Sequence, residues 1–223
     1  MRPLSVVLIH AAFVLATFSA SAQTPNPAYA PVTDTPGLPR VLLVGDSISV
    51  GYTLPVRALL KGKANVHRLP ENGGPTIRGL EKIDTWIGAG PWDVIHFNWG
   101  LHDLKVMEGG KHQVPLDEHR KNLETLVGRM EATGAKLIWA STTPVPEGKL
   151  SPVRRPKDVL AFNKVAAEIM AAHEIPVNDL YGLVLPRLSS LQRPVNVHFT
   201  DEGSAALAGR VAFAIRTALA EAK

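Results

Sequence analysis

The amino-acid sequence predicts one three-layer α/β domain over residues 40–223, built on a five-stranded parallel sheet. Short apolar runs alternate with amphipathic helical patterns along this region, and small and polar residues gather directly after the runs. The chain has 223 residues, 45% of them hydrophobic and 20% charged, which is enough for a single domain with a substantial core. We expect its strand–helix–strand connections to be right-handed.

The first expected strand is the run from Val41 to Val44, which is apolar throughout and ends at Gly45-Asp46-Ser47. Such a run is typical of a strand buried on both faces. Further strands are expected at 64–69, 93–98, 136–140 and 175–177. Helices are expected at 54–60, 76–87, 115–132 and 156–172, with a final helix capped by Thr200. The first helix is expected to begin at residue 54 because Pro55 fits only in a first turn.

The N-terminal 39 residues differ in composition from the rest. Residues 1–22 resemble a secretory signal peptide, with Arg2, an apolar stretch and a small-residue cleavage pattern before Gln23. The apolar stretch is short for a membrane span. Residues 23–39 contain five prolines and predict an extended leader or linker. We therefore expect a periplasmic or secreted protein, with no stable membrane anchor after signal cleavage.

Charge and cysteine content narrow the possible partners. The formal net charge is +4, but no run of Lys or Arg marks a nucleic-acid surface, so no nucleic-acid partner is expected. The chain contains no cysteine and therefore forms no disulfide.

Residues able to carry chemistry follow the expected strands, at the edge where a parallel sheet gathers its ligands. Ser47, Gly74 and His102 follow the first three strands, and Asn196 and His198 precede the final helix. A serine needs a base to become nucleophilic, a histidine has the suitable pKa, and glycine amides can stabilise an oxyanion. This combination indicates acyl transfer; the alternative for Ser47 is a simple helix-capping role.

The order of these motifs resembles that of the SGNH (GDSL) hydrolase family. The family's four blocks correspond here to Gly45-Asp46-Ser47, Gly74, Gly100-Leu101-His102-Asp103 and Val195-Asn196-Val197-His198. The resemblance covers nearly all of residues 40–220 and implies a flavodoxin-like sheet and a serine esterase without metal or other cofactor. It implies that Ser47 is the nucleophile and His198 the base, with the amides of Ser47 and Gly74 and the side chain of His102 as oxyanion donors.

The sequence departs from the family pattern at two positions. His102 replaces an asparagine that donates to the oxyanion; an imidazole N–H can donate the same bond, and Asn98 is a second candidate. Val195 replaces the aspartate that orients the catalytic histidine. We expect Asn196 to orient His198 through its amide oxygen and count it as the third catalytic residue; the alternative is that Asn196 only fixes its own turn.

The expected function is a serine esterase that removes short acyl groups, acetyl in particular, from a small-molecule or carbohydrate ester. Two other hypotheses stay open. One is a metal-dependent phosphoesterase, for which Asp46, His102, Asp103 and His198 could cluster. The other is a catalytically impaired carbohydrate-binding relative, suggested by Val195.

Overall fold

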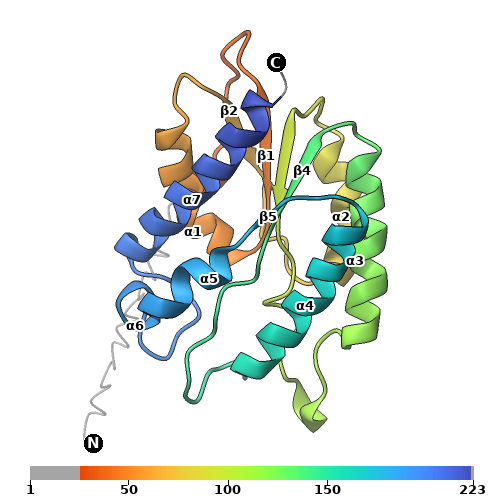
Figure 1. The fold of residues 1–223 in the computed structure, drawn as a ribbon, viewed down its shortest axis with the longest axis vertical. Helices are drawn as coiled ribbons and strands as arrows, with labels where there is room; N and C mark the ends of the chain where they lie inside the picture. Colours follow the sequence, from red (N-terminus) through yellow and green to blue (C-terminus); the bar gives the residue numbers. More distant parts are fainter. Residues whose placement is uncertain (1–25, 222–223) are drawn as a thin grey trace, which may run out of the picture.

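The computed structural model describes residues 26–221, so the expected signal peptide lies outside the described residues. Its centre is a parallel sheet in the order β2-β1-β3-β4-β5 (Figure 1). The strands are β1 (Arg40–Val44), β2 (Asn65–Arg68), β3 (Val94–Phe97), β4 (Lys136–Ala140) and β5 (Val177–Asn178). This is the flavodoxin-like order. The predicted fold class is confirmed.

Helices cover both faces of the sheet (Figure 1). One face carries α1 (Ser47–Leu59), α5 (Leu180–Val184), α6 (Leu188–Leu191) and α7 (Asp201–Ala220). The other carries α2 (Thr76–Ile87), α3 (Leu116–Glu131) and α4 (Pro156–Ala172). Short 3₁₀ turns are η1 (Pro27–Tyr29), η2 (Glu108–Gly110) and η3 (Leu185–Arg187).

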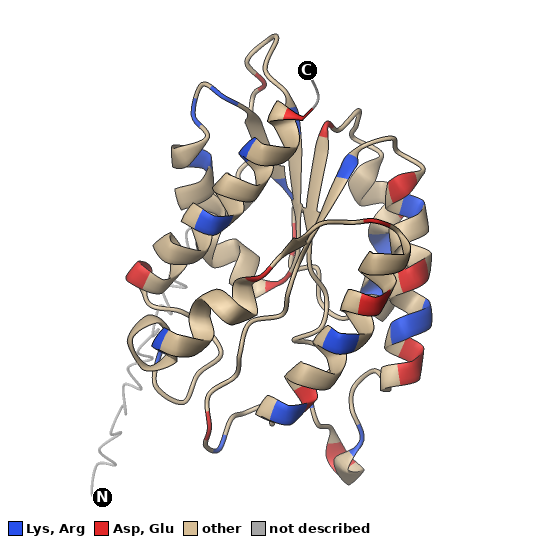
Figure 2. Cartoon of the chain, viewed as in Figure 1, with Lys and Arg blue, Asp and Glu red and all other residues tan. Residues whose placement is uncertain are grey.

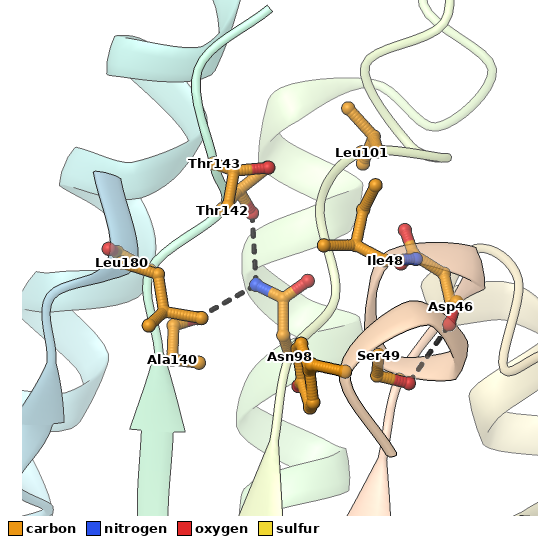
Figure 3. Close-up of a pocket in the computed structure, with 12 residues that line it drawn as sticks. Asp46, Ile48, Ser49, Asn98, Leu101, Ala140, Thr142, Thr143 and Leu180 are labelled. Atoms are coloured by element: carbon orange, nitrogen blue, oxygen red, sulfur yellow. Dashed lines mark hydrogen bonds between the residues drawn. The ribbon is translucent and has the colours of Figure 1, made fainter. Parts of the chain in front are cut away.

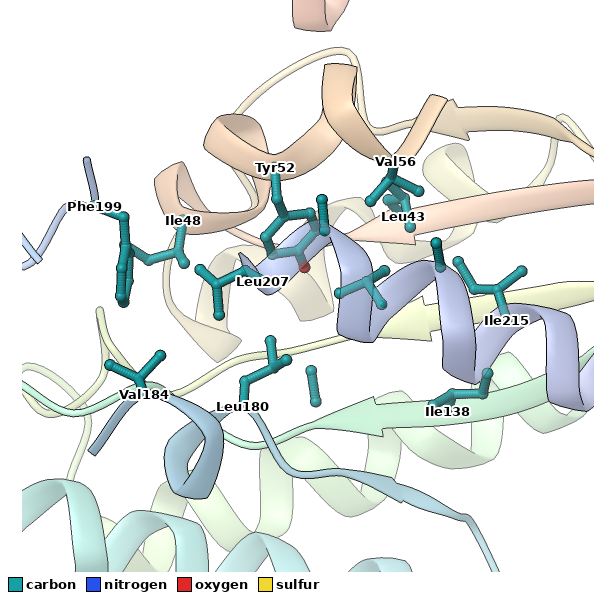
Figure 4. Close-up of a cluster of buried hydrophobic side chains, with 14 of the residues drawn as sticks. Leu43, Ile48, Tyr52, Val56, Ile138, Leu180, Val184, Phe199, Leu207 and Ile215 are labelled. Carbon is teal, nitrogen blue, oxygen red and sulfur yellow. The ribbon is translucent and has the colours of Figure 1, made fainter. Parts of the chain in front are cut away.

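The apolar run of β1 divides its side chains between the two cores. Val41 and Leu43 join the cluster under α1 and α7 (Figure 4), whereas Leu42 and Val44 join the cluster under α2, α3 and α4. This alternation is the two-residue period of a strand with a layer on each side. It explains why β1 is apolar at every position, and it anchors the turn that follows.

Helix α1 begins at Ser47 rather than at residue 54, so the predicted start was wrong. Asp46 caps the helix, because its Oδ1 accepts the N–H of Ile48 at 2.9 Å. Pro55 consequently lies inside the helix and removes one backbone hydrogen bond. Burial of Tyr52 and Val56 in the core under α1 and α7 offsets that loss.

The described part of the leader, from residue 26 onward, packs against the domain rather than extending from it as a free linker. The Asn65 side chain accepts the N–H of Thr35 at 2.9 Å and donates to the carbonyl oxygens of Thr35 and Leu38. The Arg68 guanidinium lies 4.7 Å from the centre of the Tyr29 ring. These contacts hold the leader against the domain, and the proline-rich composition of the leader does not predict them.

Acidic and basic residues are interspersed along α3 and α4 (Figure 2). This mixture is typical of helix faces in contact with water. Among the described residues, no helix combines the length and apolar character needed to cross a bilayer.

Candidate active site

Ser47 is the first residue of α1 and follows directly from the buried strand β1. Asp46 takes the N–H of Ile48, while the backbone N–H of Ser47 makes no hydrogen bond within residues 26–221. The helix dipole favours negative charge at this end. Ser47 therefore presents a hydroxyl and a free backbone donor where an oxyanion can form.

His198 lies in a loop that is fixed by its own backbone. The N–H of Arg193 donates to the carbonyl of His198 at 2.9 Å, and Gln192 and Phe199 form an isolated bridge. The Gln192 side chain also donates to the carbonyl oxygens of Pro144 and Val197, at 2.9 and 3.0 Å. This loop places Nε2 of His198 2.9 Å from Oγ of Ser47, across 151 residues of sequence.

Asn196 contacts the other side of the same imidazole. Its Oδ1 lies 2.8 Å from Nδ1 of His198 and also accepts the backbone N–H of His198 at 2.9 Å. Because an amide oxygen only accepts, Nδ1 of His198 carries the hydrogen and Nε2 keeps a lone pair for the Ser47 hydroxyl. The sequence suggested that Asn196 either orients His198 or only fixes its own turn. Its Oδ1 does both, because it contacts the imidazole and accepts the backbone N–H of His198.

Val195 offers the imidazole no hydrogen-bond acceptor, although it lines the same cavity as His198. The residue is 55% exposed, and its backbone has a φ of +47°, which is unusual for a β-branched residue. A Cβ built on Gly148 would lie 3.3 Å from the Val195 side chain, so these two loops touch at the surface. At the position of the family's aspartate, this chain therefore has an exposed apolar residue that lines the cavity.

His102 lines the same cavity as Ser47 and His198, from the loop after β3. Its Nδ1 lies 3.0 Å from Nζ of Lys105, and its Nε2 lies 3.9 Å from Oδ2 of Asp46. A lysine ammonium only donates, so Nδ1 of His102 accepts and Nε2 carries the hydrogen of the neutral ring. Lys105 thereby gives His102 a free donor at Nε2.

The backbone of Gly74 does not present the donor expected from the sequence. Its N–H donates to Oδ1 of Asn72 at 2.9 Å, in a tight turn where Gly74 has a φ of +61°. The N–H of Gly73 donates to the carbonyl of Gly45 at 3.0 Å, and a Cβ on Gly73 would lie 2.9 Å from that oxygen. The two glycines therefore allow close packing of the loop, and the side chain of Asn72 occupies the expected donor.

Asn98 lines a different, small cavity of about 10 Å³, together with Asp46, Ile48 and Thr142 (Figure 3). Its amide nitrogen donates to the carbonyl of Ala140 at 2.8 Å and to Oγ1 of Thr142 at 3.0 Å. Both amide hydrogens are therefore used inside the protein. His102, rather than Asn98, is the side chain with a donor in the cleft.

Asp103 is a buried carboxylate that connects the loop of His102 to neighbouring helices. Its carboxylate accepts the backbone N–H of Thr76, at 3.1 and 3.2 Å for its two oxygens, and the hydroxyl of the same residue. Nδ1 of His119 lies 3.4 Å away. These contacts tie the His102 loop to the start of α2 and to α3. Within residues 26–221, no three His, Cys, Asp or Glu side chains are grouped to hold a metal ion.

Burial lowers the pKa of the His198 imidazole, an effect that the Asp46 carboxylate opposes and that Arg193 and Arg154 reinforce. Burial likewise lowers the pKa of His102, against the opposing charge of Asp46 and with the help of Lys105 and Arg154. Both rings are therefore neutral at pH 7. A neutral His198 can accept the Ser47 proton, and a neutral His102 can donate from Nε2.

Two cavities meet at Ser47 and His198. One, of about 250 Å³, is polar and includes Asn72, His102, Lys105, Arg154 and Asn196 among its lining residues. The other, of about 350 Å³, is lined by the apolar Ile48, Val50, Pro55 and Phe199 and by the polar Arg193, Asp201 and Ser204. The two portions of an ester bound at Ser47 can therefore occupy different cavities.

Comparison with known families agrees with this arrangement. The model of the GDSL-like Lipase/Acylhydrolase family matches residues 43–206. This range includes strands β2 to β5 and every residue that lines the two cavities at Ser47. The chain belongs to this family. It is accordingly an esterase or acylhydrolase of the SGNH (GDSL) type.

Solved structures share the fold of this GDSL-family esterase. The lipase/acylhydrolase from Enterococcus faecalis has a TM-score of 0.71 at 23% identity, covering 81% of this chain and 96% of that one. An acetyl xylan esterase, AlAXEase, has a TM-score of 0.68 at 15% identity, covering 79% and 99%. An acetylxylan esterase from Geobacillus stearothermophilus has a TM-score of 0.65 at 19% identity, covering 78% and 92%. No curated protein matches the sequence.

Two cationic residues in the cleft of this esterase, Lys105 and Arg154, were not predicted from the sequence. Lys105 had a usable signal, since it lies two residues after the block from Gly100 to Asp103 that contains His102. Arg154 had none, because it comes from the segment before α4, far from every motif.

Proposed function

We propose that this protein is an exported serine esterase that hydrolyses short acyl esters, acetyl esters of carbohydrates in particular, through an acyl-enzyme on Ser47. The observation that carries the proposal is the continuous contact from Oγ of Ser47 to Nε2 of His198 and from Nδ1 of His198 to Asn196. Its geometry suits proton transfer from the serine to the imidazole.

In the first step, the Ser47 oxygen attacks the ester carbonyl while its proton passes to Nε2 of His198. The carbonyl oxygen becomes an oxyanion, which the backbone N–H of Ser47 and Nε2–H of His102 stabilise. His198 then protonates the departing alcohol. Water, activated by the same imidazole, attacks the acyl-enzyme, releases the carboxylic acid and restores the Ser47 hydroxyl.

Two features support a small acyl group on a carbohydrate. The polar cavity of about 250 Å³ is lined by side chains that can hydrogen-bond to a sugar, among them Asn72, Lys105 and Arg154. Two structures with the same fold are acetyl xylan esterases by name. The signal-like residues 1–22 support export to the place where such polymers are found.

A fluorophosphonate probe tests the nucleophile directly. We expect the probe to label the protein at Ser47, as mapped by mass spectrometry, and to inhibit hydrolysis of p-nitrophenyl acetate. Ser47→Ala should lose both labelling and hydrolysis. Ser49→Ala is the matched control, because Ser49 lies in the same helical turn but its hydroxyl donates to the Asp46 carbonyl. Labelling that persists in Ser47→Ala would refute the mechanism.

Substrate and export need separate tests. The protein should release acetate from acetylated xylo-oligosaccharides. Among p-nitrophenyl esters, it should hydrolyse the acetate faster than esters of longer acyl groups. The mature protein, recovered from the periplasm or medium of a bacterial host, should begin at Gln23. Retention of residues 1–22 would contradict the proposed export.

A further inference from the structure

Two cations form one wall of the polar cavity beside Ser47. Lys105 comes from the loop after β3, and Arg154 comes from the segment before α4. Both line the same cavity of about 250 Å³ as Ser47 and His198. In so small a space, any group that contacts both cations lies close to the ester bond under attack.

Arg154 is buried, and no carboxylate within residues 26–221 forms an ion pair with it. Only 8% of the residue is exposed, and its Nε donates to the carbonyl of Leu101 at 2.8 Å. Its Nη1 makes a long contact of 3.4 Å with the carbonyl of Pro152, and its Nη2 makes no hydrogen bond within residues 26–221. Nε thus fixes the guanidinium while the rest of the fork remains available in the cavity.

The ammonium group of Lys105 also lacks an acidic partner among the described residues, and its one hydrogen bond there is to Nδ1 of His102 at 3.0 Å. Burial and the neighbouring Arg154 lower the pKa of Lys105, an effect that Asp46 and Asp103 only partly oppose. The nearby carboxylates make no ion pair with Lys105 or Arg154 among the described residues: Oδ1 of Asp46 caps α1, its Oδ2 lies 3.9 Å from Nε2 of His102, and Asp103 accepts from Thr76. Partly buried cations without ion-pair partners are destabilising, which favours a ligand that supplies the missing charge.

We propose that Lys105 and Arg154 form a subsite for an anionic oxygen group of the substrate, so that the preferred ester carries a carboxylate or sulfate beside its acyl group. This rests on the proposed function, and it narrows the substrate from carbohydrate esters in general to acidic ones. Arginine presents a planar fork of donors that matches such an anion, and lysine adds a point charge.

The same cations could instead act only on the reaction centre, by stabilising the oxyanion or by fixing the tautomer of His102. These roles make different predictions. A role at the reaction centre affects every ester alike, whereas a subsite affects only esters that carry the anion. The ratio of kcat/KM for an anionic ester to that for its neutral analogue therefore isolates the subsite.

The experiment uses acetylated galacturonic acid and its methyl ester, which differ in one charge. For the wild-type protein we expect kcat/KM to favour the acid by about tenfold or more, as charge-assisted hydrogen bonds allow. Lys105→Met should bring the ratio close to one, and Lys105→Arg should retain most of the preference. Lys149→Met is the matched control, because Lys149 is exposed in the neighbouring loop and its loss should leave the ratio unchanged.

A second measurement needs no variant. Free galacturonate should inhibit hydrolysis of p-nitrophenyl acetate by the wild-type protein more strongly than galactose does. Two further pairs of substrates define the anion. Comparison of a sulfated acetyl sugar with its unsulfated analogue shows whether the subsite accepts sulfate. Comparison of mono-p-nitrophenyl succinate with p-nitrophenyl butyrate shows whether the anion belongs to the acyl portion rather than to the alcohol. A preference for the anionic member of either pair supports the subsite.

The inference is overturned if the wild-type protein shows no preference within any pair, or if Lys105→Met slows both members of a pair equally. Its failure differs from failure of the proposed function. A protein that hydrolyses p-nitrophenyl acetate and is labelled at Ser47 but ignores the anion refutes the subsite alone, whereas absence of labelling and hydrolysis refutes the esterase mechanism.

Discussion

The two histidines of the cleft, His198 and His102, have opposite tautomers because their neighbours differ. Asn196 accepts from Nδ1 of His198, so Nε2 of that ring keeps a lone pair facing Ser47. Lys105 donates to Nδ1 of His102, so Nε2 of that ring carries a hydrogen. One side chain type thus supplies both a base and a donor. The second contact of each ring, rather than the ring itself, decides its chemistry.

The largest effect should come from removing the base. We expect His198→Ala to lower kcat by about 10⁴–10⁶, the range for loss of a triad member, because Ser47 then has no proton acceptor. Steady-state kinetics with p-nitrophenyl acetate measure this loss, with circular dichroism as the control for folding. A loss no greater than that of His102→Ala would remove the distinction between the two rings.

His102 should have a smaller effect, through the oxyanion alone. We expect His102→Ala to lower kcat by about 10²–10³, with KM changing less, since the bond strengthens in the transition state. His102→Asn, which restores the family's residue, should recover part of the loss. An unchanged kcat in His102→Ala would mean that the Ser47 backbone donor is sufficient.

A third histidine, His96, shows how burial changes the pKa of an imidazole that does not line the catalytic cavities. It lies in β3 with no exposed surface, Nδ2 of Asn178 lies 3.0 Å from its Nε2, and burial lowers its pKa to about 4. The unfolded chain, with a histidine pKa near 6.5, binds more protons below pH 6.5. The free energy of unfolding should therefore fall by roughly 3 kcal/mol on this account between pH 6.5 and 4.

Chemical denaturation of the wild-type protein and His96→Gln across this pH range tests the expectation. The curve of the variant should be flatter, because glutamine does not titrate. Since His102 and His198 remain in both proteins, their contributions cancel in the difference. Parallel curves would show that His96 is not the source.

The sequence was informative where periodicity and end signals coincide. The predicted helices at 76–87 and 156–172 and the strand at 136–140 match α2, α4 and β4. α1 was misplaced because the rule for Pro55 outweighed the capping signal of Asp46, and the outcome depended on packing against α7. The short helices α5 and α6 were missed, since one or two turns depend on tertiary contacts more than on local pattern.

The candidate site was predictable in its residues and less so in its bonds. Asn196 is two residues from His198, so its contact followed from local chain geometry. The N–H of Gly74, by contrast, is taken by Asn72, which no motif indicated. The pairing of Lys105 with Arg154 also required the fold, because an isolated cation in a sequence is indistinguishable from one on the surface.

The smallest effect should come from Asn196, which orients His198 without carrying charge. We expect Asn196→Ala to lower kcat/KM by about tenfold, the value of roughly one hydrogen bond. The wild-type pH profile should rise with an apparent pKa below 6.5, because burial lowers the pKa of His198 and the neutral ring is the active base. Activity should therefore persist to lower pH than in an enzyme whose imidazole faces a carboxylate.

Asn196→Asp places a negative charge against Nδ1 of His198 and should shift this rising limb to higher pH, with a faster rate on the alkaline side, because the carboxylate stabilises the imidazolium. Val195→Asp is the matched comparison: it adds the same charge one residue earlier, at a residue that is 55% exposed, while Asn196 keeps its contact with Nδ1 of His198. Its limb should move much less. Equal shifts in Asn196→Asp and Val195→Asp would indicate a general charge effect. If the profiles of Asn196→Ala and Asn196→Asp both superimpose on that of the wild type, Asn196 has no part in the mechanism. A selective shift in Asn196→Asp would show that the 2.8 Å contact sets the basicity of His198.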